Sequence, residues 1–378
     1  MKKNGNPVIC ICDADRSYLQ RLDAYLRSHL KLPVQIHCFT DAEGLMSFIG
    51  REQTLVLIIS SRMLGQACTI GDLAGFGSLL VLEEEPVQLG QVAEDETEGD
   101  ALLIRMGTQA IPEERTRRIS KYRESSGVVH NVLELCMELP EETIRGLRIA
   151  EDSGTRRIAL YSPVHGLGQT SLSLALAQLL GESGRRVLLL NLEPCAGWSE
   201  PTRITGLPGP VWQEETAQKD EPGELLPEEQ ETLTELLYYA ECSEARFALR
   251  LQQIRRTFGA AEYIPPVRLP GQLREISAAQ WQSLLRLIER EGGYDDLILD
   301  LSEAVSGLEE LLSGADRILM LTGSDPVSER RTRAYERSLS LSGAESILLK
   351  TEKVTLPPGA CAQERMLRQV AEELLGHA

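Results

Sequence analysis

The strongest constraint on the fold is an alternation of short apolar runs with longer amphipathic segments, which occurs twice along the chain. In the first 135 residues, runs such as 8–12 (VICIC) alternate with segments such as 17–30, whose leucines recur at helical spacing. A second series begins at 156–162 (RRIALYS) and continues through the apolar run 294–301. Strands that alternate with helices predict parallel sheets covered on both faces. We therefore expect an α/β protein with two doubly wound parallel-sheet domains.

Interruptions of this alternation indicate the domain boundaries. We expect a first domain at 1–137, a charged linker at 138–155 and a second domain at 156–378. The second domain is interrupted from about 195 to 232 by a stretch rich in Pro, Gly and Glu, which we expect to be an acidic insertion outside the core. Two domains are also what a chain of 378 residues normally forms.

Charge and composition disfavour several classes of function. The net charge of −18 and an aromatic content of 4% predict that nucleic acid is not a ligand. The arginines of 328–338 (SERRTRAYERS) have glutamates nearby in a chain that is negatively charged overall, so we interpret them as a solvated helix face. The apolar residues of 364–376 lie on one side of a helix whose other side has mixed charge, so packing on its own domain is favoured over membrane attachment.

The expected localisation rests on the hydrophobic segments and on the cysteines of the sequence. No segment approaches the roughly 20 apolar residues that a membrane-spanning helix needs. The eight cysteines show no metal-ligand spacing and are interpreted as small buried hydrophobic residues of a reducing compartment. We therefore expect a cytoplasmic protein that contacts a membrane only indirectly, through partners.

A glycine-rich segment at 162–171 (SPVHGLGQTS) follows an apolar run and leads into a helical pattern. It fits the frame of a phosphate-binding loop, G-x-x-x-x-G-K-[ST], in which backbone N–H groups bind phosphate and the hydroxyl after the lysine binds Mg²⁺. Gln169 stands at the lysine position, and a neutral amide cannot neutralise the charge that develops in phosphoryl transfer. If ATP binding is retained, the candidate binding residues are Gly166, Leu167, Gly168, Gln169, Thr170, Ser171, Asn191 and Glu193.

A second nucleotide motif is expected further along the chain. The apolar run of 294–301 (YDDLILDL) ends near Asp300, which would hold Mg²⁺ together with Thr170 if ATP binds. The run of 185–194 (RRVLLLNLEP) comes one helix after the loop, where the neighbouring strand of the sheet is expected. The motifs have the order of a P-loop fold, but they do not by themselves establish nucleotide turnover.

The order of these motifs resembles the MinD/ParA superfamily of deviant Walker ATPases. Its pattern of KGGxGKT, a strand ending in DxDP and a Walker B strand corresponds here to VHGLGQT, NLEP and LILD. Val164 and Gln169 replace two lysines, and Asn191 replaces the first acid of the second motif. Glu193 and Asp300 keep their carboxylates. The resemblance implies a P-loop fold that dimerises, and the three replacements predict that ATP hydrolysis is absent or slow.

The first domain resembles the receiver domain of response regulators. Asp13 and Asp15 follow its first apolar run, at or near the positions of the receiver's metal-binding acids, and Lys121 matches the receiver lysine. Ser60 ends the third strand, where the phosphate-accepting aspartate belongs, so the resemblance implies a pseudo-receiver. A second interpretation is that Asp13 and Asp15 only cap the following helix.

A receiver-like domain followed by a MinD/ParA-like domain is the arrangement of the TadZ/CpaE family, which localises the type IVb (Flp/Tad) pilus and secretion machinery at the cell pole. The segments 233–239 (LTELLYY) and 261–285 are also similar to that family. The resemblance implies a homodimer, located at the cell pole or at the inner face of the membrane, whose partners include the secretion ATPase of the pilus.

The leading hypothesis for the function is a non-catalytic localisation scaffold. The alternatives are an ATP-binding switch or slow ATPase, and an atypical response regulator.

Overall fold

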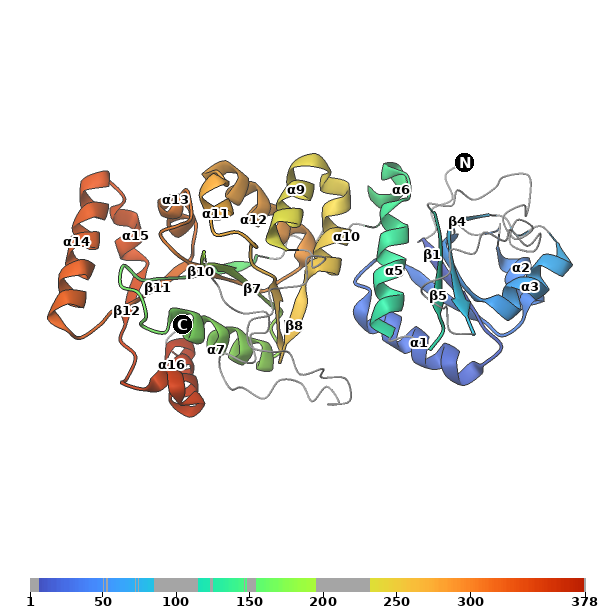
Figure 1. Ribbon diagram of the computed structural model, residues 1–378, viewed down its shortest axis with the longest axis horizontal. Coiled ribbons are helices and arrows are strands. Elements are labelled where there is room, and N and C mark those ends of the chain that lie inside the picture. The colour runs from blue at the N-terminus through green and yellow to red at the C-terminus, as the bar shows by residue number, and fades with distance from the viewer. Residues whose placement is uncertain are drawn as a thin grey trace. The chain divides into compact units, whose positions relative to one another are not determined.

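The computed structural model describes residues 7–49, 51, 54–71, 73, 75–84, 115–122, 125–145, 147, 154–194 and 232–376. They form two compact units, the first made mainly of Met1–Ile149 and the second mainly of residues 150–378. Each unit contains its own sheet (Figure 1). The expected acidic insertion lies outside the described residues except for Thr232, and so does the middle of the expected linker.

The first unit is a five-stranded parallel sheet with the strand order β2-β1-β3-β4-β5. Its strands are β1 (Val8–Cys12), β2 (Gln35–Phe39), β3 (Thr54–Ser60), β4 (Phe76–Glu83) and β5 (Thr116–Ser120). Its helices are α1 (Arg16–His29), α2 (Ala42–Phe48), α3 (Ser61–Ile70), α5 (Ser125–Met137) and α6 (Glu141–Arg145). This is the flavodoxin-like order, in which ligands bind at the carboxyl ends of the strands.

The two central strands of the first unit explain why its sequence is so apolar there. Every residue of β1 and of β3 is buried, as expected for parallel strands that helices cover on both faces. Polar side chains are therefore confined to the strand ends, where Asp13 and Ser60 are both buried. The buried acid Asp13 consequently lies at the carboxyl edge of the sheet.

The second unit is a seven-stranded sheet with the order β12-β11-β6-β10-β7-β9-β8, in which only the β8–β9 pair is antiparallel. Its strands are β6 (Arg156–Tyr161), β7 (Val187–Leu192), β8 (Arg256–Phe258), β9 (Ala261–Ile264), β10 (Asp296–Leu301), β11 (Arg317–Leu321) and β12 (Thr351–Val354). Its helices are α7 (Gln169–Glu182), α9 (Leu233–Cys242), α11 (Gln272–Glu275), α12 (Ala278–Gly292), α13 (Leu308–Ser313), α14 (Pro326–Ser342), α15 (Glu345–Leu349) and α16 (Glu364–Gly376). A further helix, α10 (Glu244–Ile254), is divided, because its residues Ala248–Gln253 are counted with the first unit. The prediction of two doubly wound parallel-sheet units is confirmed.

One detail of the strand order differs from the expectation. The strand at 185–194 was expected beside the strand before the glycine-rich loop, but β10 lies between β7 and β6 and pairs with both. All six residues of β10 are buried, which suits a strand with neighbours on both edges and helices on both faces. The register sets Asp300 opposite Asn191 on one side and Leu160 on the other. The acid of β10 is thereby placed directly beside the loop strand.

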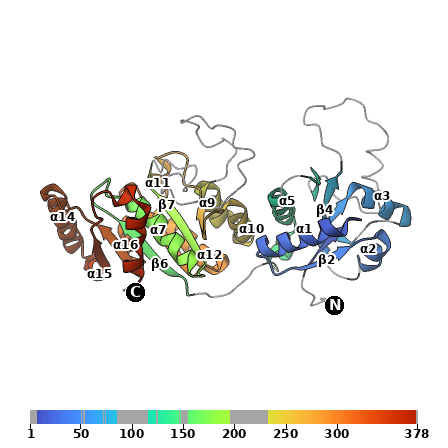
Figure 2. The same ribbon diagram turned by 90° about the horizontal axis from the view of Figure 1, so that it is seen from below.

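The C-terminal helix packs on its own unit, as predicted. Leu367, Ala371 and Leu374 of α16 are buried in the same core cluster as the apolar face of α7. Figure 2 shows α16 and α7 side by side, and Arg368 of α16 forms an ion pair with Glu182 of α7. Within the described ranges, no helix is both long enough and apolar enough to cross a membrane.

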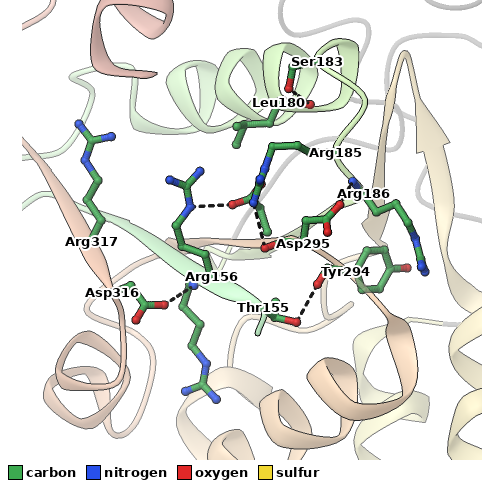
Figure 3. A network of polar contacts seen from close by, with 12 residues as sticks. Thr155, Arg156, Leu180, Ser183, Arg185, Arg186, Tyr294, Asp295, Asp316 and Arg317 are labelled. Carbon is green, nitrogen blue, oxygen red and sulfur yellow. Dashed lines mark hydrogen bonds and ion pairs between the residues drawn. The ribbon is translucent and has the colours of Figure 1, made fainter. Parts of the chain in front are cut away.

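A buried carboxylate at the amino end of β10 ties together both neighbouring strands. The side chain of Asp296 is 0% exposed, and its Oδ1 accepts a hydrogen bond from Arg156 Nε at 2.8 Å. Its Oδ2 accepts a hydrogen bond from Arg185 Nε. Figure 3 shows the side chains of Arg156 and Arg185 side by side. Because Arg156 begins β6 and Arg185 lies two residues before β7, this pairing fixes the edge opposite the glycine-rich loop. Arg185 is therefore not a substitute for the missing lysine of that loop.

We expect the double substitution Arg156→Met and Arg185→Met to lower the free energy of unfolding by about 3–5 kcal/mol, because it leaves the buried Asp296 carboxylate without a cation. The measurement is urea unfolding followed by circular dichroism. The control is Arg333→Met, whose ion pair with Glu329 is 74% and 51% exposed. That control should cost less than about 1 kcal/mol. Equal losses for the two variants would contradict the role given to Asp296.

Candidate functional site

The glycine-rich loop connects β6 to α7 and keeps the backbone shape of a phosphate-binding loop. Gly166 and Gly168 have φ values of +77° and +86°, in the left-handed region that favours glycine. The hydroxyl of Ser162 accepts a hydrogen bond from the Val164 N–H at 3.0 Å and lies 2.8 Å from the Leu321 carbonyl oxygen. The loop is therefore held to the ends of β6 and β11, and α7 begins directly after it at Gln169.

Val164, which the sequence resemblance matches to a signature lysine, is a buried residue in this chain. Val164 is only 8% exposed, and its backbone groups are engaged by the Ser162 hydroxyl. A side chain placed this way cannot extend from the loop toward a ligand or a second subunit. The neighbouring His165 is exposed, and its Nε2 lies 2.9 Å from Glu303 Oε1.

At the position of the Walker lysine, the side chain of Gln169 points into the fold. Its Nε2 donates to Asp300 Oδ1 at 2.6 Å and to the Leu301 carbonyl oxygen at 2.8 Å. The other oxygen of Asp300, Oδ2, accepts a hydrogen bond from Asn191 Nδ2 at 3.1 Å, and Ser173 Oγ lies 3.4 Å from it. Neutral amides and a hydroxyl thus surround the fully buried Asp300 carboxyl group, at the place where a phosphate-binding loop would hold a cation.

Burial and a second acid alter the titration of this cluster. Burial raises the pKa of Asp300 to about 7, with a further increase from the negative charge of Glu193, while the hydrogen bond from Gln169 opposes the shift. Burial also raises the pKa of Glu193, and a hydrogen bond with Thr170 opposes that shift. The structure therefore brings Gln169, Thr170, Asn191, Glu193 and Asp300 together.

The donor set of this cluster does not fit Mg²⁺ or a triphosphate. Mg²⁺ needs ionised or carbonyl oxygens free to coordinate it, and both oxygens of Asp300 face N–H or O–H groups. Among the described residues, no group of three His, Cys, Asp or Glu side chains is placed to hold a metal ion. The lysine that would neutralise the outer phosphates is replaced by an amide already engaged inside the protein. The arrangement surrounds a buried acid with neutral donors.

Two predicted nucleotide-binding residues stand apart from the cluster. Leu167 packs against the core of the second unit together with Leu356. Ser171 is half-buried in the first turn of α7.

Two contacts of the site were not predicted from the sequence. Ser173 lies one helical turn after Gln169, and this i, i+4 spacing could have identified it as a neighbour of Asp300. A Cβ atom at Gly168 would lie 2.1 Å from Cys361 Sγ and 3.0 Å from Leu356 Cδ1. The segment after β12 is therefore in direct contact with the loop, and no motif in the sequence signals that contact.

The first unit has its own buried polar site at the carboxyl edge of its sheet. Lys121 Nζ lies 2.9 Å from Asp13 Oδ1 and 2.7 Å from Asp13 Oδ2, and both side chains are buried. The ammonium group also lies 4.9 Å from the centre of the Tyr18 ring. Ser60 lies one residue beyond the Cys12–Ile59 pairing of β1 and β3, and its buried hydroxyl has no hydrogen-bond partner among the described residues.

The two acids after β1 have different structural roles. Asp15 is the N-cap of α1, because its Oδ1 accepts hydrogen bonds from the N–H groups of Ser17 at 2.8 Å and Tyr18 at 3.2 Å. These hydrogen bonds lower the pKa of Asp15. Asp13 accepts a hydrogen bond from the Asp15 N–H at 2.8 Å and pairs with Lys121. The capping interpretation is therefore confirmed for Asp15, whereas Asp13 serves a buried ion pair.

We expect Lys121→Met to lower the free energy of unfolding of the first unit by about 3 kcal/mol, because it strands the Asp13 carboxylate in the core. Adding Asp13→Asn should recover most of the lost free energy of unfolding, since the unpaired charge is then removed. Unfolding of the full chain is followed by hydrogen exchange, which reports each unit separately. No recovery in the double variant would show that the loss does not come from the charge of Asp13.

A second prediction concerns the pH dependence that Asp300 contributes. Its pKa is higher in the folded chain than in the unfolded chain, so the stability that it contributes is present at low pH and is lost as the pH rises toward 7. The stability of Asp300→Asn relative to wild type should therefore increase by about 1–2 kcal/mol between pH 5.5 and pH 8. Urea unfolding of both proteins at the two pH values measures this difference, and a constant difference would contradict the raised pKa.

Comparisons with known proteins concern only part of the chain. No protein-family model matches it, and no curated protein matches it. Similar solved structures include the MinC:MinD complex from Aquifex aeolicus, at 14% identity over 59% of this chain and 97% of that chain, with a TM-score of 0.39. A second is cobyrinic acid a,c-diamide synthase from Mycobacterium smegmatis with bound ATP analog and magnesium, at 16% identity over 59% of this chain and 95% of that chain, with a TM-score of 0.38.

A third solved structure is a McdA–ATP complex from Cyanothece, at 20% identity over 51% of this chain and 66% of that chain, with a TM-score of 0.35. The chain thus spans just under two thirds of the McdA chain's own length.

Proposed function

We propose that this protein is a non-hydrolysing localisation scaffold of a type IVb (Flp/Tad) pilus or secretion apparatus, and that it acts as a homodimer. It would be cytoplasmic, and partners such as the secretion ATPase would bring it to the cell pole or to the inner face of the membrane. The pilus role is supported by the resemblance of the two-domain arrangement, and of segments such as 261–285, to the TadZ/CpaE family.

The observation that carries the non-catalytic part of the proposal is the hydrogen bond from Gln169 to Asp300. In this contact the residue at the lysine position binds the residue at the magnesium position, 2.6 Å away. Asn191, at the position of a further catalytic acid, donates to the same carboxyl group. Three positions that would act on a nucleotide are therefore joined to one another.

The first unit supports the same conclusion from a separate site. A receiver needs a carboxylate at the end of β3 to form an acyl phosphate, and Ser60 has only a hydroxyl group, which is buried. Lys121 is already paired with Asp13. The chemistry of this unit therefore does not favour an atypical response regulator that is controlled by phosphorylation.

An ATP-binding switch is the second candidate. It is favoured by the left-handed conformations of Gly166 and Gly168, which leave the loop backbone in the shape that accepts phosphate oxygens. Binding through backbone N–H groups alone would require the Gln169 side chain to leave Asp300. A scaffold and a switch therefore differ in one measurable property, which is whether ATP changes the affinity for a partner.

We expect the purified full-length chain to show no saturable binding of a fluorescent ATP analogue with Mg²⁺ and no phosphate release above background. Gln169→Lys should gain binding, by ~10-fold or more, because a cation then faces the loop. It should still not hydrolyse ATP, since Val164 and Asn191 remain. Capture of the pilus secretion ATPase by the wild-type chain should be equal with and without ATP.

The control for Gln169→Lys is Gln282→Lys, which adds the same charge on the exposed side of α12. It should bind no more analogue than wild type. Saturable wild-type binding together with ATP-dependent capture would favour the switch. Hydrolysis that Gln169→Ala abolishes would establish a slow ATPase instead. Failure to capture the secretion ATPase at all would contradict the pilus role and leave the nucleotide results standing.

A further inference from the structure

Helix α14 exposes a cluster of arginines on the outside of the second unit. Its buried side is formed by Ser328, Thr332 and Leu339, which recur at helical spacing. The exposed residues opposite them include four arginines, which we call the arginine face: Arg330, Arg331, Arg333 and Arg337. In Figure 1, α14 lies beside α15, next to the β12 end of the sheet.

Most of this positive charge is uncompensated. Arg333 forms an exposed ion pair with Glu329 at 3.0 Å, and Arg330 Nε donates to the Pro326 carbonyl oxygen at 3.1 Å. In the part of the chain that the structure describes, Arg330, Arg331 and Arg337 have no acidic partner. An unpaired cationic cluster is unexpected in a chain whose net charge is −18.

The arginine face also has an apolar border. Val327 is 52% exposed and Leu341 is 80% exposed, and they lie at the two ends of the same helix. Three guanidinium groups without an acidic partner among the described residues, between two exposed aliphatic side chains, suit a partner that carries carboxylates interspersed with apolar residues.

We propose that the arginine face binds the acidic segment 214–231 of the same chain. That segment contains eight acidic residues and one lysine, and it includes Leu225 and Leu226. Its charge is opposite to that of the arginine face, and its leucines can contact the apolar border. The acidic segment would then compete with other polyanions for the arginine face.

The chain is long enough to make this contact. The segment between Pro194 and Thr232 begins at the end of β7, which is three strand positions from β11, the strand before α14. Three positions correspond to about 14 Å in a sheet. Twenty residues from Pro194 to Glu214 can span up to about 66 Å, and eleven residues from Glu221 to Thr232 about 36 Å. The central acids can therefore reach the first turns of α14.

An intrachain partner is favoured over nucleic acid by charge and by concentration. The overall charge of −18 repels a phosphate backbone, whereas the acidic segment cannot leave the chain. A tethered segment has an effective concentration in the millimolar range, so even a weak contact is populated. The inference depends neither on nucleotide binding nor on the pilus role.

The test uses the full chain with five central acids neutralised, and a fluorescein-labelled peptide of residues 211–231 as the probe. The neutralising substitutions are Glu214→Gln, Glu215→Gln, Asp220→Asn, Glu221→Gln and Glu224→Gln. Because the neutralised chain can no longer fill its own site, we expect it to bind the peptide at least ~10-fold more tightly than wild type at 50 mM NaCl. Raising the NaCl concentration to 300 mM should weaken that binding strongly.

The arginine face is tested in the neutralised chain. Arg330→Glu, Arg331→Glu and Arg337→Glu together should abolish peptide binding. The matched control changes the net charge by the same amount at exposed arginines elsewhere, with Arg274→Glu, Arg286→Glu and Arg365→Glu. This control should retain peptide binding. Circular dichroism verifies that each variant is folded. In addition, hydrogen exchange of α14 in the full chain should be slower in wild type than in the neutralised chain.

Three outcomes would overturn the proposal. Equal peptide affinity of wild type and the neutralised chain would show that the segment does not occupy the site in the intact protein. Peptide binding that persists after the charges of the three arginines are reversed would place the contact on another surface. Binding of a DNA duplex through the arginine face, without binding of the peptide, would assign that face to nucleic acid.

Discussion

The second unit depends on how one buried carboxyl group is stabilised. Asp300 ends the central strand β10, where β6 and β7 pair on its two sides, so it cannot be moved to solvent without disrupting the sheet. Gln169 and Asn191 donate to it from the loop helix and from β7. Neutral donors stabilise the acid, although burial still raises its pKa. The helix after the glycine-rich loop and the strand β7 are thereby joined to β10 through one carboxyl group.

The strands, the helices and the fold class could be predicted because apolar periodicity reports burial directly. The runs at 8–12 and 294–301 are apolar because helices cover both faces of their strands. The position of β10 between β6 and β7 could not be predicted, because the sequence contains no signal for which buried strands pair. The inward direction of the Gln169 side chain could not be predicted either. An amide group can form hydrogen bonds with water or with buried groups, so the residue type does not determine its direction.

Each unit has a buried acid at the carboxyl edge of its sheet, but different groups stabilise the two acids. In the first unit a charged pair, Lys121 with Asp13, satisfies the buried acid at the carboxyl edge of the sheet. In the second unit, amides satisfy Asp300. The sequence indicated which residues would lie near each edge, because carboxyl ends of parallel strands converge. It could not distinguish Asp13, which pairs, from Asp15, which caps, because the two differ only in which backbone N–H groups they face.

The burial of Val164 has a consequence for any substitution at this position. The side chain is 8% exposed, and the backbone N–H and carbonyl oxygen of the residue are hydrogen-bonded to the Ser162 hydroxyl. A lysine here would have to carry its ammonium group out to solvent, because a buried unpaired charge is costly. The loop is thus a poor place to engineer a cation, since a charge added at position 164 would act first on the packing of the loop itself.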